Sequence, residues 1–261
     1  GRVAHQANLP AGAEVVAPSA VELPGEMYTD AQGMQPHTPA RAMTLRDIEQ
    51  TQEEFVQAAR NAIDSGFDGV EIHAANGYLV EQFIHPHTNR RSDDYGGDMQ
   101  KRCRFALELA AKVCDAIGND KVGVRLSPYG TFNDMPHYPE IDETYLWLAE
   151  QLNSTGICYI HLCDMSGMGG PEIPETLKHG IRDSFRGNLI LCGGYDKTKA
   201  ERVIESGLTD LVAFGRPFIS NPDLVARMRN DWPLAEPDMD TFYTPGEKGY
   251  ADYPEYGGSA D

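Results

Sequence analysis

The sequence predicts an α/β fold, a (β/α)8 TIM barrel that is incomplete in this chain. Short, nearly continuous apolar segments alternate with segments of helical spacing from residue 44 onward. Such strands are buried on both faces, as in parallel sheets. Each predicted strand ends in polar residues or glycine, which is where barrels carry their chemistry. No G-x-G-x-x-G follows a strand, and this disfavours the alternative, a doubly wound dinucleotide-binding sheet.

The elements are expected in a regular order. A first helix begins after Thr44, which with Asp47 has the spacing of a capping box, and it ends at Gly66. Further helices are expected at 102–117, 145–152, 174–185 and 197–205, and a last one opens at Asn221-Pro222. The strands are expected in "GVEIHA", "KVGVRLSP", "CYIHLCD", "NLILCGG" and "DLVAFG". Five strands do not close a barrel of eight.

Residues 1–43 are rich in Pro, Gly and Ala and show no clear βα pattern. We expect an irregular loop there, with a possible hairpin over the mouth of the barrel. Residues 1–261 are interpreted as a single domain. We expect the domain to be N-terminally truncated, because the strands that would complete the barrel would precede residue 1.

Composition and charge exclude several classes of partner. The chain has 40 acidic and 22 basic residues and a net charge of −18, which argues against nucleic acid and anionic membranes. No apolar run reaches the length of a membrane span, and the start has no signal-peptide pattern. The five cysteines are scattered and odd in number, so we expect reduced thiols and a cytoplasmic location.

The residues after "GVEI" are the first candidates for chemistry. His73 and Asn76 can donate two hydrogen bonds to one oxygen, and Tyr78 can donate a proton nearby. From these three residues alone, a satisfied strand-end histidine and a turn-forming Asn-Gly pair are an equal alternative.

Five segments together closely resemble the old yellow enzyme family of flavin-dependent ene-reductases. They are "GVEIHAANGYLVEQFIHPHTNRRSDDYGG", "VGVRLSPYGTFNDM", "LILCGGY", "LVAFGRPFISNPDL" and "TFY…GYADYP", and they occur in the order that the family has. The resemblance implies an FMN-binding barrel whose strands 4 to 8, with the tail of strand 3, lie in this chain. It also implies that hydride from NADPH or NADH passes through FMN to an activated C=C bond of an α,β-unsaturated carbonyl or nitro compound.

The resemblance assigns roles to the residues near the first strand. His73 and Asn76 match the pair that binds the substrate's oxygen, where they stabilise the charge that grows as hydride arrives. Tyr78 matches the catalytic proton donor. Tyr243 matches a substrate-pocket residue and Phe242 a residue that covers the flavin, although ordinary aromatic packing is an alternative for both.

The resemblance also implies a cofactor site. Arg125 matches the residue beside the flavin ring, where a positive charge favours the anionic reduced form; a structural ion pair is the alternative. A phosphate site is implied at two successive strand ends, where glycine amides and an arginine can bind phosphate oxygens. Its residues are Gly193, Gly194, Gly215 and Arg216. The spacing of His85 and His87 suits a metal, but no metal site is expected.

Other functions remain open from the sequence. A catalytically silent barrel fragment that binds a partner is one, since an unfinished sheet exposes two backbone edges. An aldolase-type barrel would want a catalytic lysine at a strand end, and Lys121 begins a strand instead. The expected partners are small enones or nitro compounds and phenolic ligands, and a homo-oligomer is one of the assemblies that the sequence allows. The sequence does not distinguish NADPH from NADH.

Overall fold

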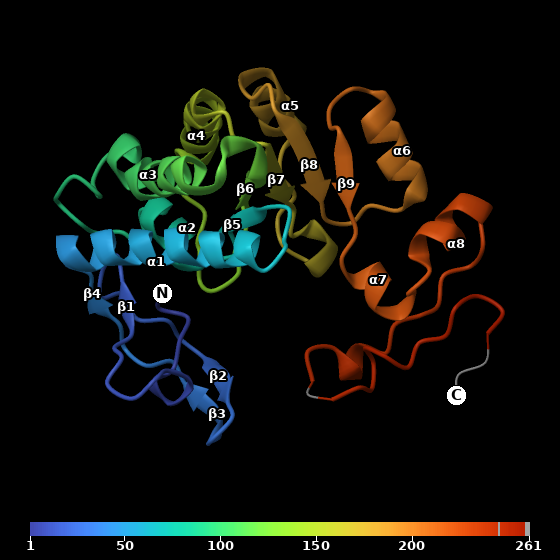
Figure 1. The fold of residues 1–261 in the computed structure, drawn as a ribbon, viewed down its shortest axis with the longest axis horizontal. Helices are drawn as coiled ribbons and strands as arrows, with labels where there is room; N and C mark the ends of the chain where they lie inside the picture. The colour runs from blue at the N-terminus through green and yellow to red at the C-terminus, as the bar shows by residue number, and fades with distance from the viewer. Residues whose placement is uncertain (245, 259–261) are drawn as a thin grey trace.

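The computed structural model describes residues 1–244 and 246–258. Its centre is a parallel sheet in the order β5-β6-β7-β8-β9 (Figure 1). The strands are β5 (Val70–Ala74), β6 (Val122–Leu126), β7 (Tyr159–Cys163), β8 (Asn188–Cys192) and β9 (Leu211–Ala213). All five predicted strands are therefore present, each next to its neighbour in the sequence, which is the arrangement of consecutive βα units.

The helices are α1 (Leu45–Asp64), α2 (Leu79–Ile84), α3 (Met99–Ile117), α4 (Ile141–Thr155), α5 (Glu175–Ser184), α6 (Lys197–Glu205), α7 (Arg216–Ser220) and α8 (Leu224–Asn230). The helices α3 to α6 lie between successive strands and cover one face of the sheet, whereas α7 and α8 follow β9 (Figure 1). The capping box of α1 is confirmed: Thr44 accepts from the amide of Asp47, whose carboxylate accepts from the amide of Thr44. The end of this helix at residue 66 is confirmed as well, within one or two residues.

One helix prediction needs correction, and one short helix was not predicted. The last helix was expected to open at Asn221-Pro222, but α8 begins at Leu224 after its N-cap Asp223. A short helix, α7, precedes it, and the sequence did not predict that helix. Its proline follows Arg216 directly, at the start of the helix, where proline is tolerated because the first amides have no intrahelical acceptor.

The two faces of the sheet differ in chemistry. Ile72, Val124 and Ile160 are register partners on the face toward the helices and are almost fully buried. The opposite face carries polar residues on the same strands. Those at one level are His73, Arg125 and His161. The apolar core thus lies between the sheet and its helices, and the polar face is left for the site.

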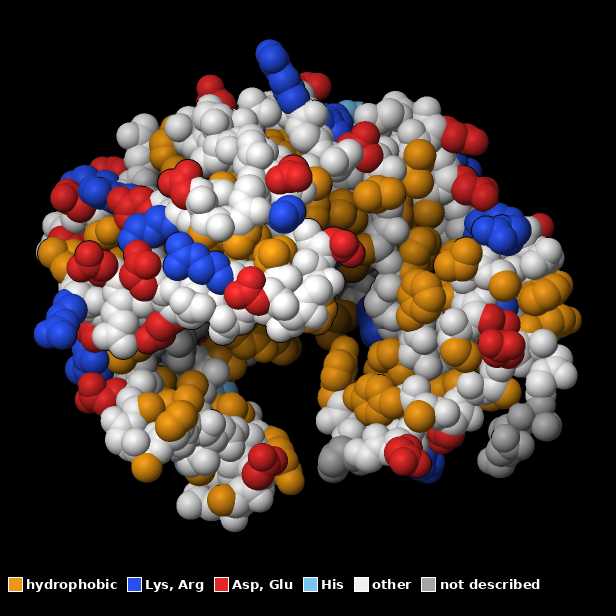
Figure 2. All heavy atoms as spheres, in the orientation of Figure 1, with side chains coloured by type: hydrophobic (Ala, Val, Ile, Leu, Met, Phe, Trp, Pro, Cys, Tyr) orange, Lys and Arg blue, Asp and Glu red, His pale blue; other side chains and the backbone are white. Residues whose placement is uncertain are grey.

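The N-terminal region contains a hairpin of β2 (Glu26–Thr29) and β3 (Gly33–Pro36). Next to it, β1 (Val16–Ala17) pairs in parallel with β4 (Arg41–Ala42). This region and the C-terminal segment both lie beyond the edge of the sheet at which the strands end (Figure 1). Figure 2 shows the molecule hollowed between them, with hydrophobic side chains along both walls. Within the described residues, none of the helices combines the length and apolar character that a membrane crossing requires.

Candidate active site

His73 lies one residue before the end of β5, directly beside Arg125 of β6 in the sheet register. Its half-buried imidazole lies against the ring of Tyr78, with 5.3 Å between the ring centroids and a tilt of 48°. Burial lowers the pKa of His73, and the charge of Arg125 lowers it further. The imidazole is therefore neutral near pH 7 and keeps one N–H donor.

Asn76 and Gly77 form the turn between β5 and α2, and both have positive φ angles, 58° and 71°. Side chains from the loop after β6 hold Asn76 in this conformation. Its backbone N–H donates to the hydroxyl of Ser127 over 2.7 Å, and its carbonyl accepts from the Asn133 amide over 2.8 Å. Its side-chain Oδ1 is buried and has no hydrogen-bond partner within residues 1–244 and 246–258, which is a feature of ligand sites as well as of strain.

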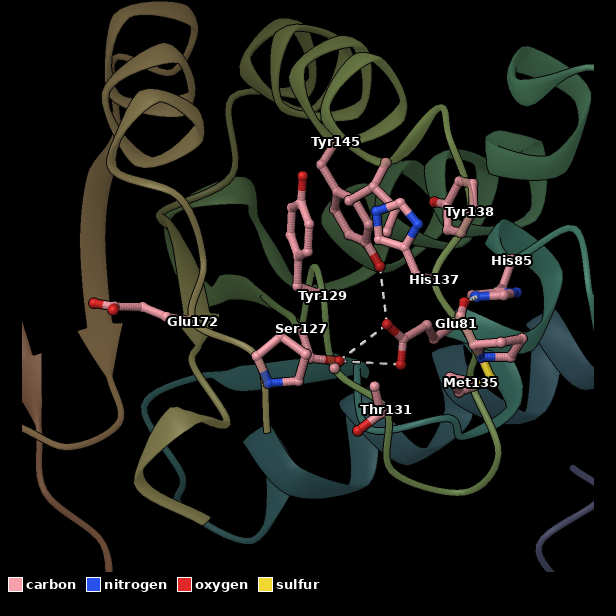
Figure 3. Close-up of a pocket in the computed structure, with 14 residues that line it drawn as sticks. Glu81, His85, Ser127, Tyr129, Thr131, Met135, His137, Tyr138, Tyr145 and Glu172 are labelled. Atoms are coloured by element: carbon pink, nitrogen blue, oxygen red, sulfur yellow. Dashed lines mark hydrogen bonds between the residues drawn. The ribbon is translucent and has the colours of Figure 1, made fainter. Parts of the chain in front are cut away.

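Gly77 is held by the first turn of the helix that follows. Its N–H donates to the carboxylate of Glu81 over 2.6 Å, and its carbonyl accepts from the side chain of Gln82 over 2.6 Å. Glu81 also accepts from the hydroxyls of Ser127 and Tyr145, the latter over 2.8 Å (Figure 3). All four backbone polar groups of the Asn76-Gly77 pair are thus bound by side chains, so the turn that leads to Tyr78 is fixed.

Glu81 is an ionisable residue with almost no exposure to solvent, 3 %. Burial raises its pKa to about 7, against the hydrogen bonds that favour the charged form. A cavity of about 310 Å³ lies beside the carboxyl, walled by residues such as Thr131, Met135 and Tyr138 (Figure 3). Sequence reasoning did not find Glu81. Its only signal was a charge in the apolar run "YLVEQF", four residues after a turn glycine.

Arg125 makes one side-chain hydrogen bond, from Nη2 to the sulfur of Cys163 over 3.0 Å. Its Nε is buried and has no partner among the described residues. Cys163 is the register partner of Cys192 on β8. A hydrogen bond from the Cys192 thiol lowers the pKa of Cys163 to about 6, and Arg125 adds to this against the effect of burial. The guanidinium therefore faces a thiolate and keeps an unused donor, and no carboxylate pairs with it within 4 Å in the described part of the chain.

The glycines of the expected phosphate site lie together with Arg216. The guanidinium of Arg216 donates to the carbonyl of Gly167 over 2.8 Å. A Cβ on Gly167 would lie 3.1 Å from the amide nitrogen of Gly194 and 3.3 Å from Nη2 of Arg216. Gly193 and Gly194 both have positive φ. Gly215 caps α7, and a Cβ there would meet nothing within 4 Å. The bare backbone and the arginine thus form an open cradle at the ends of β8 and β9.

Phe242 and Tyr243 lie in the C-terminal segment, with their ring centroids 6.0 Å apart. Tyr243 is 79 % exposed and has a positive φ of 59°. Its backbone N–H donates to the hydroxyl of Tyr250. Among residues 1–244 and 246–258, no hydrogen bond or ring contact joins Phe242 or Tyr243 to His73. The assignment of these two aromatics to the flavin and substrate pocket therefore stays a prediction.

A further polar pair on the inner face of the sheet was not assigned from the sequence. Nδ1 of His161 and the Glu71 carboxylate are 2.9 Å apart. Burial is the largest single influence and raises the pKa of Glu71, but the hydrogen bond with His161 and the further contributions of His161, Tyr159 and Arg125 together outweigh it, so the net shift is downward. The carboxylate is charged near pH 7 and can accept a hydrogen bond from Nδ1 of His161, whose buried Nε2 has no partner among the described residues. In the sequence, His161 is only one polar residue near the end of a predicted strand, because its partner lies 90 positions away.

His85 and His87 point their ring nitrogens at protein groups. Nε2 of His85 lies 2.8 Å from the carbonyl of Pro136, and its Nδ1 accepts from the backbone N–H of His87. Nε2 of His87 lies 3.4 Å from the carboxylate of Asp134. The two rings are 6.3 Å apart and perpendicular, so their spacing in the sequence reflects local structure.

Comparison with known proteins identifies the family. Residues 3–235 match the model of the NADH:flavin oxidoreductase / NADH oxidase family. A putative 12-oxophytodienoate reductase 11 of Oryza sativa subsp. japonica is 40% identical over 97% of this chain and 70% of its own length. A probable flavin mononucleotide-dependent alkene reductase of Leishmania infantum is 39% identical, also over 97% and 70%. Morphinone reductase superposes with a TM-score of 0.92 at 39% identity, over 98% of this chain and 70% of that structure.

The chain spans 58% to 70% of the length of the curated relatives that it matches. The superposition confirms the predicted fold class, with β5 to β9 corresponding to part of a (β/α)8 barrel. The family model covers most of the chain. The rice and Leishmania relatives are identical to the chain at more than a third of the aligned positions, over nearly all of its length. The chain therefore belongs to the NADH:flavin oxidoreductase family, the family of the old yellow enzymes and 12-oxophytodienoate reductases.

Proposed function

We propose that this chain acts in the FMN-dependent reduction of activated C=C bonds in α,β-unsaturated carbonyl or nitro compounds, with hydride from NADPH or NADH. One observation carries the proposal. Two candidate oxygen ligands, His73 and Asn76, and a candidate proton donor, Tyr78, lie at the end of one strand, and Arg125 is the register partner of His73. The Leishmania relative's name, an FMN-dependent alkene reductase, supports the same chemistry.

His73 and Asn76 bind and polarise the substrate's oxygen. The neutral imidazole donates one hydrogen bond and the side-chain amide of Asn76 a second. Negative charge builds on this oxygen when hydride reaches the β-carbon, so donors that are already in place stabilise the transition state more than the ground state. The fixed turn at Asn76 keeps the amide from reorienting when the charge appears.

Tyr78 supplies the proton for the α-carbon. Its side chain is 38 % exposed, so the phenol reaches solvent, from which its proton can be restored. Its ring lies 5.3 Å from that of His73. A substrate whose oxygen is bound at His73 therefore has its α-carbon within reach of the phenol, which is the proximity that general acid catalysis requires.

The residues present fit FMN. Gly194, Gly215 and Arg216 form an open cradle with free backbone and one guanidinium, which suits a phosphate. The buried Nε of Arg125 has no partner in the part of the chain that the structure describes and can donate to a polar edge of the flavin ring. When bound, FMN supplies the hydride that the substrate receives. Arg125 would stabilise negative charge on the ring, and His73 and Asn76 would orient the substrate against it.

A second candidate function is that of a barrel fragment that binds a partner without catalysis. It is favoured by the sheet itself, because β5 and β9 each have only one hydrogen-bonded neighbour within residues 1–244 and 246–258. Strands with an open backbone edge can pair with another chain, including a second copy. Sedimentation shows whether the purified chain is a monomer, and an enone assay shows whether it is active. A monomer that turns over an enone excludes this function.

Phenol binding to the flavin-loaded chain tests the proposed function. A phenolate bound at His73 and Asn76 would stack on the flavin and give a long-wavelength absorption band. We expect this band in the unaltered chain, and we expect His73→Ala with Asn76→Ala to abolish it while flavin is retained. The matched control is His87→Ala, a histidine in the loop after α2 that faces Asp134. A band of equal strength in the double variant would overturn the assignment.

A further inference from the structure

The turn that leads to the candidate proton donor is held by hydrogen bonds to a single buried carboxyl group, that of Glu81. Glu81 accepts the N–H of Gly77 directly over 2.6 Å. It also accepts a hydrogen bond from the hydroxyl of Ser127, and this hydroxyl accepts one from the N–H of Asn76 over 2.7 Å. The backbone N–H of Gly77 is therefore bonded to this carboxyl group directly, and that of Asn76 is linked to it through the Ser127 hydroxyl.

The surroundings of Glu81 contain donors but no cation. A third donor is Tyr145 of α4, whose hydroxyl lies 2.8 Å from Oε1. No lysine, arginine or histidine pairs with Glu81 within 4 Å in the part of the chain that the structure describes. A buried carboxylate held only by neutral donors is close to the balance between its two forms, because desolvation opposes the charge and the hydrogen bonds favour it.

Protonation of this carboxyl must rearrange its hydrogen bonds. The ionised group has acceptor positions for Gly77, Ser127 and Tyr145 together, whereas the protonated group must itself donate to one of its neighbours. Ser127 cannot receive that proton without giving up its own role as donor to Glu81. Its hydroxyl must then turn its own proton away from Glu81, and this is the same hydroxyl that accepts the backbone N–H of Asn76.

We propose that Glu81 is a positioning residue, and that its protonation state sets the geometry of the Asn76–Tyr78 turn. The consequence for catalysis rests on the proposed function, in which Asn76 binds the substrate oxygen and Tyr78 donates the proton. The ionised form holds the turn as the structure shows it. The protonated form weakens the hold on Gly77 and Asn76 and lowers the affinity for an oxygen ligand.

The groups that face Glu81 leave one competing titration. Burial raises the pKa of Tyr145 well above its usual range and that of Tyr138 in the same sense, so both stay neutral. Burial lowers the pKa of His85 to about 4, so it is neutral as well. Cys163 is the exception, since its pKa is about 6 and its thiolate raises the pKa of Glu81. A cysteine variant must therefore accompany the test.

The first experiment follows the backbone amide of Gly77 by NMR as pH is raised, in the chain without cofactor. We expect its resonance to titrate with a midpoint of about 7, because its acceptor is the Glu81 carboxyl. Glu81→Gln should remove the transition. Tyr145→Phe deletes a donor that favours the carboxylate and should raise the midpoint. Cys163→Ser should leave a single transition at a slightly lower midpoint.

A matched carboxyl serves as the control. Glu108 on α3 accepts from Tyr95 and Arg104 but has no bond to the turn, so Glu108→Gln should leave the Gly77 titration unchanged. A Gly77 amide that does not titrate, or that titrates equally in Glu81→Gln, would overturn the proposal. This arm needs no flavin, so it decides the role of Glu81 even if the proposed function fails.

The second experiment measures phenol affinity of the flavin-loaded chain. We expect the ratio of the affinities of the unaltered chain and Glu81→Gln to rise at least about threefold between pH 6 and pH 8.5, as Glu81 ionises. A purely structural role would lower thermal stability but leave this ratio constant with pH. A constant ratio, with Gly77 titrating, would overturn the positioning role. Failure to retain flavin would instead count against the proposed function.

Discussion

Cys163 and Cys192 are register partners at the ends of β7 and β8, and the guanidinium of Arg125 lies 3.0 Å from the sulfur of Cys163. All five cysteines are free thiols. The hydrogen bond between the two thiols lowers the pKa of Cys163 to about 6 and raises that of Cys192. One thiol of the pair is therefore a thiolate at neutral pH, next to the cation that is proposed to face the flavin.

The first prediction concerns this thiolate. Ultraviolet titration should show one thiol with a pKa of about 6. Cys192→Ala should raise that pKa, because the main hydrogen bond to the thiolate is lost, and Arg125→Gln should raise it less. Cys114 is the matched control, since burial raises its pKa to about 11. No thiolate below pH 7 in the unaltered chain would contradict the geometry.

The second prediction concerns stability and pH. Folding raises the pKa of Glu81 from 4.5 to about 7, so the folded state holds a proton that the unfolded state releases. The contribution of Glu81 to stability is therefore full below about pH 4.5 and is lost as pH rises through 7. Relative to the unaltered chain, Glu81→Gln should gain up to about 3 kcal/mol in unfolding free energy between pH 5 and pH 8.5.

Urea unfolding at the two pH values measures that gain, and Glu108→Gln is the control. The pKa of Glu108 is lowered, since its hydrogen bonds with Arg104 and Tyr95 outweigh burial. Its variant should therefore lose stability, not gain it, as pH rises from about 4 to 6. An identical pH dependence in the two variants would show that Glu81 is not held as the structure describes.

The third prediction separates two glycines of the cradle. Gly193 has a φ of 122°, and a Cβ there would lie 2.1 Å from the carbonyl oxygen of Asp164. Gly193→Ala should therefore lower the free energy of unfolding by roughly 2–4 kcal/mol. Gly215 has an ordinary φ of −99° and open space around its Cβ position. Gly215→Ala should fold normally and lose affinity only for FMN, because the methyl group fills the cradle.

Calorimetry of both glycine variants, with and without FMN, checks these outcomes. Equal melting temperatures for Gly193→Ala and the unaltered chain would refute the close approach to Asp164. Undiminished FMN affinity in Gly215→Ala would place the phosphate elsewhere.

The fourth prediction concerns the proton donor. Tyr78→Phe keeps the ring packed against His73 but removes the hydroxyl, so enone reduction should slow on the order of 10²-fold or more. Reduction of the bound flavin by NADPH should be unaffected, because that step needs no proton from Tyr78. Stopped-flow kinetics measures the two steps separately. Equal slowing of both would mean that the variant disturbs the flavin and not the proton transfer.

Much of the fold follows from local patterns in the sequence. Strands such as 122–126 are short apolar runs bounded by turn residues, and the capping box at Thr44 is a four-residue signal. The bounds of helices were less predictable: α3 begins at Met99 and α4 at Ile141, three and four residues before the expected starts. Their first turns contain charged residues, which obscure helical periodicity.

Some residues of the candidate site were predictable from local patterns in the sequence, and others were not. The turn at Asn76 and the glycine cradle were predictable because their residues lie at strand ends, where parallel strands bring them to one edge. Glu81 was not, because its environment is set by Ser127 and Tyr145, which lie 46 and 64 positions away. Burial of a charged side chain is decided by such tertiary contacts, and no local pattern records them.

The central claim is that this chain builds a site that holds and uses FMN. The most direct test is the visible spectrum of the 261-residue chain after incubation with FMN and desalting, followed by NADPH without oxygen. We predict a retained flavin band that bleaches on adding NADPH and returns on adding an enone. A protein that emerges colourless from desalting would contradict it and favour the partner-binding fragment.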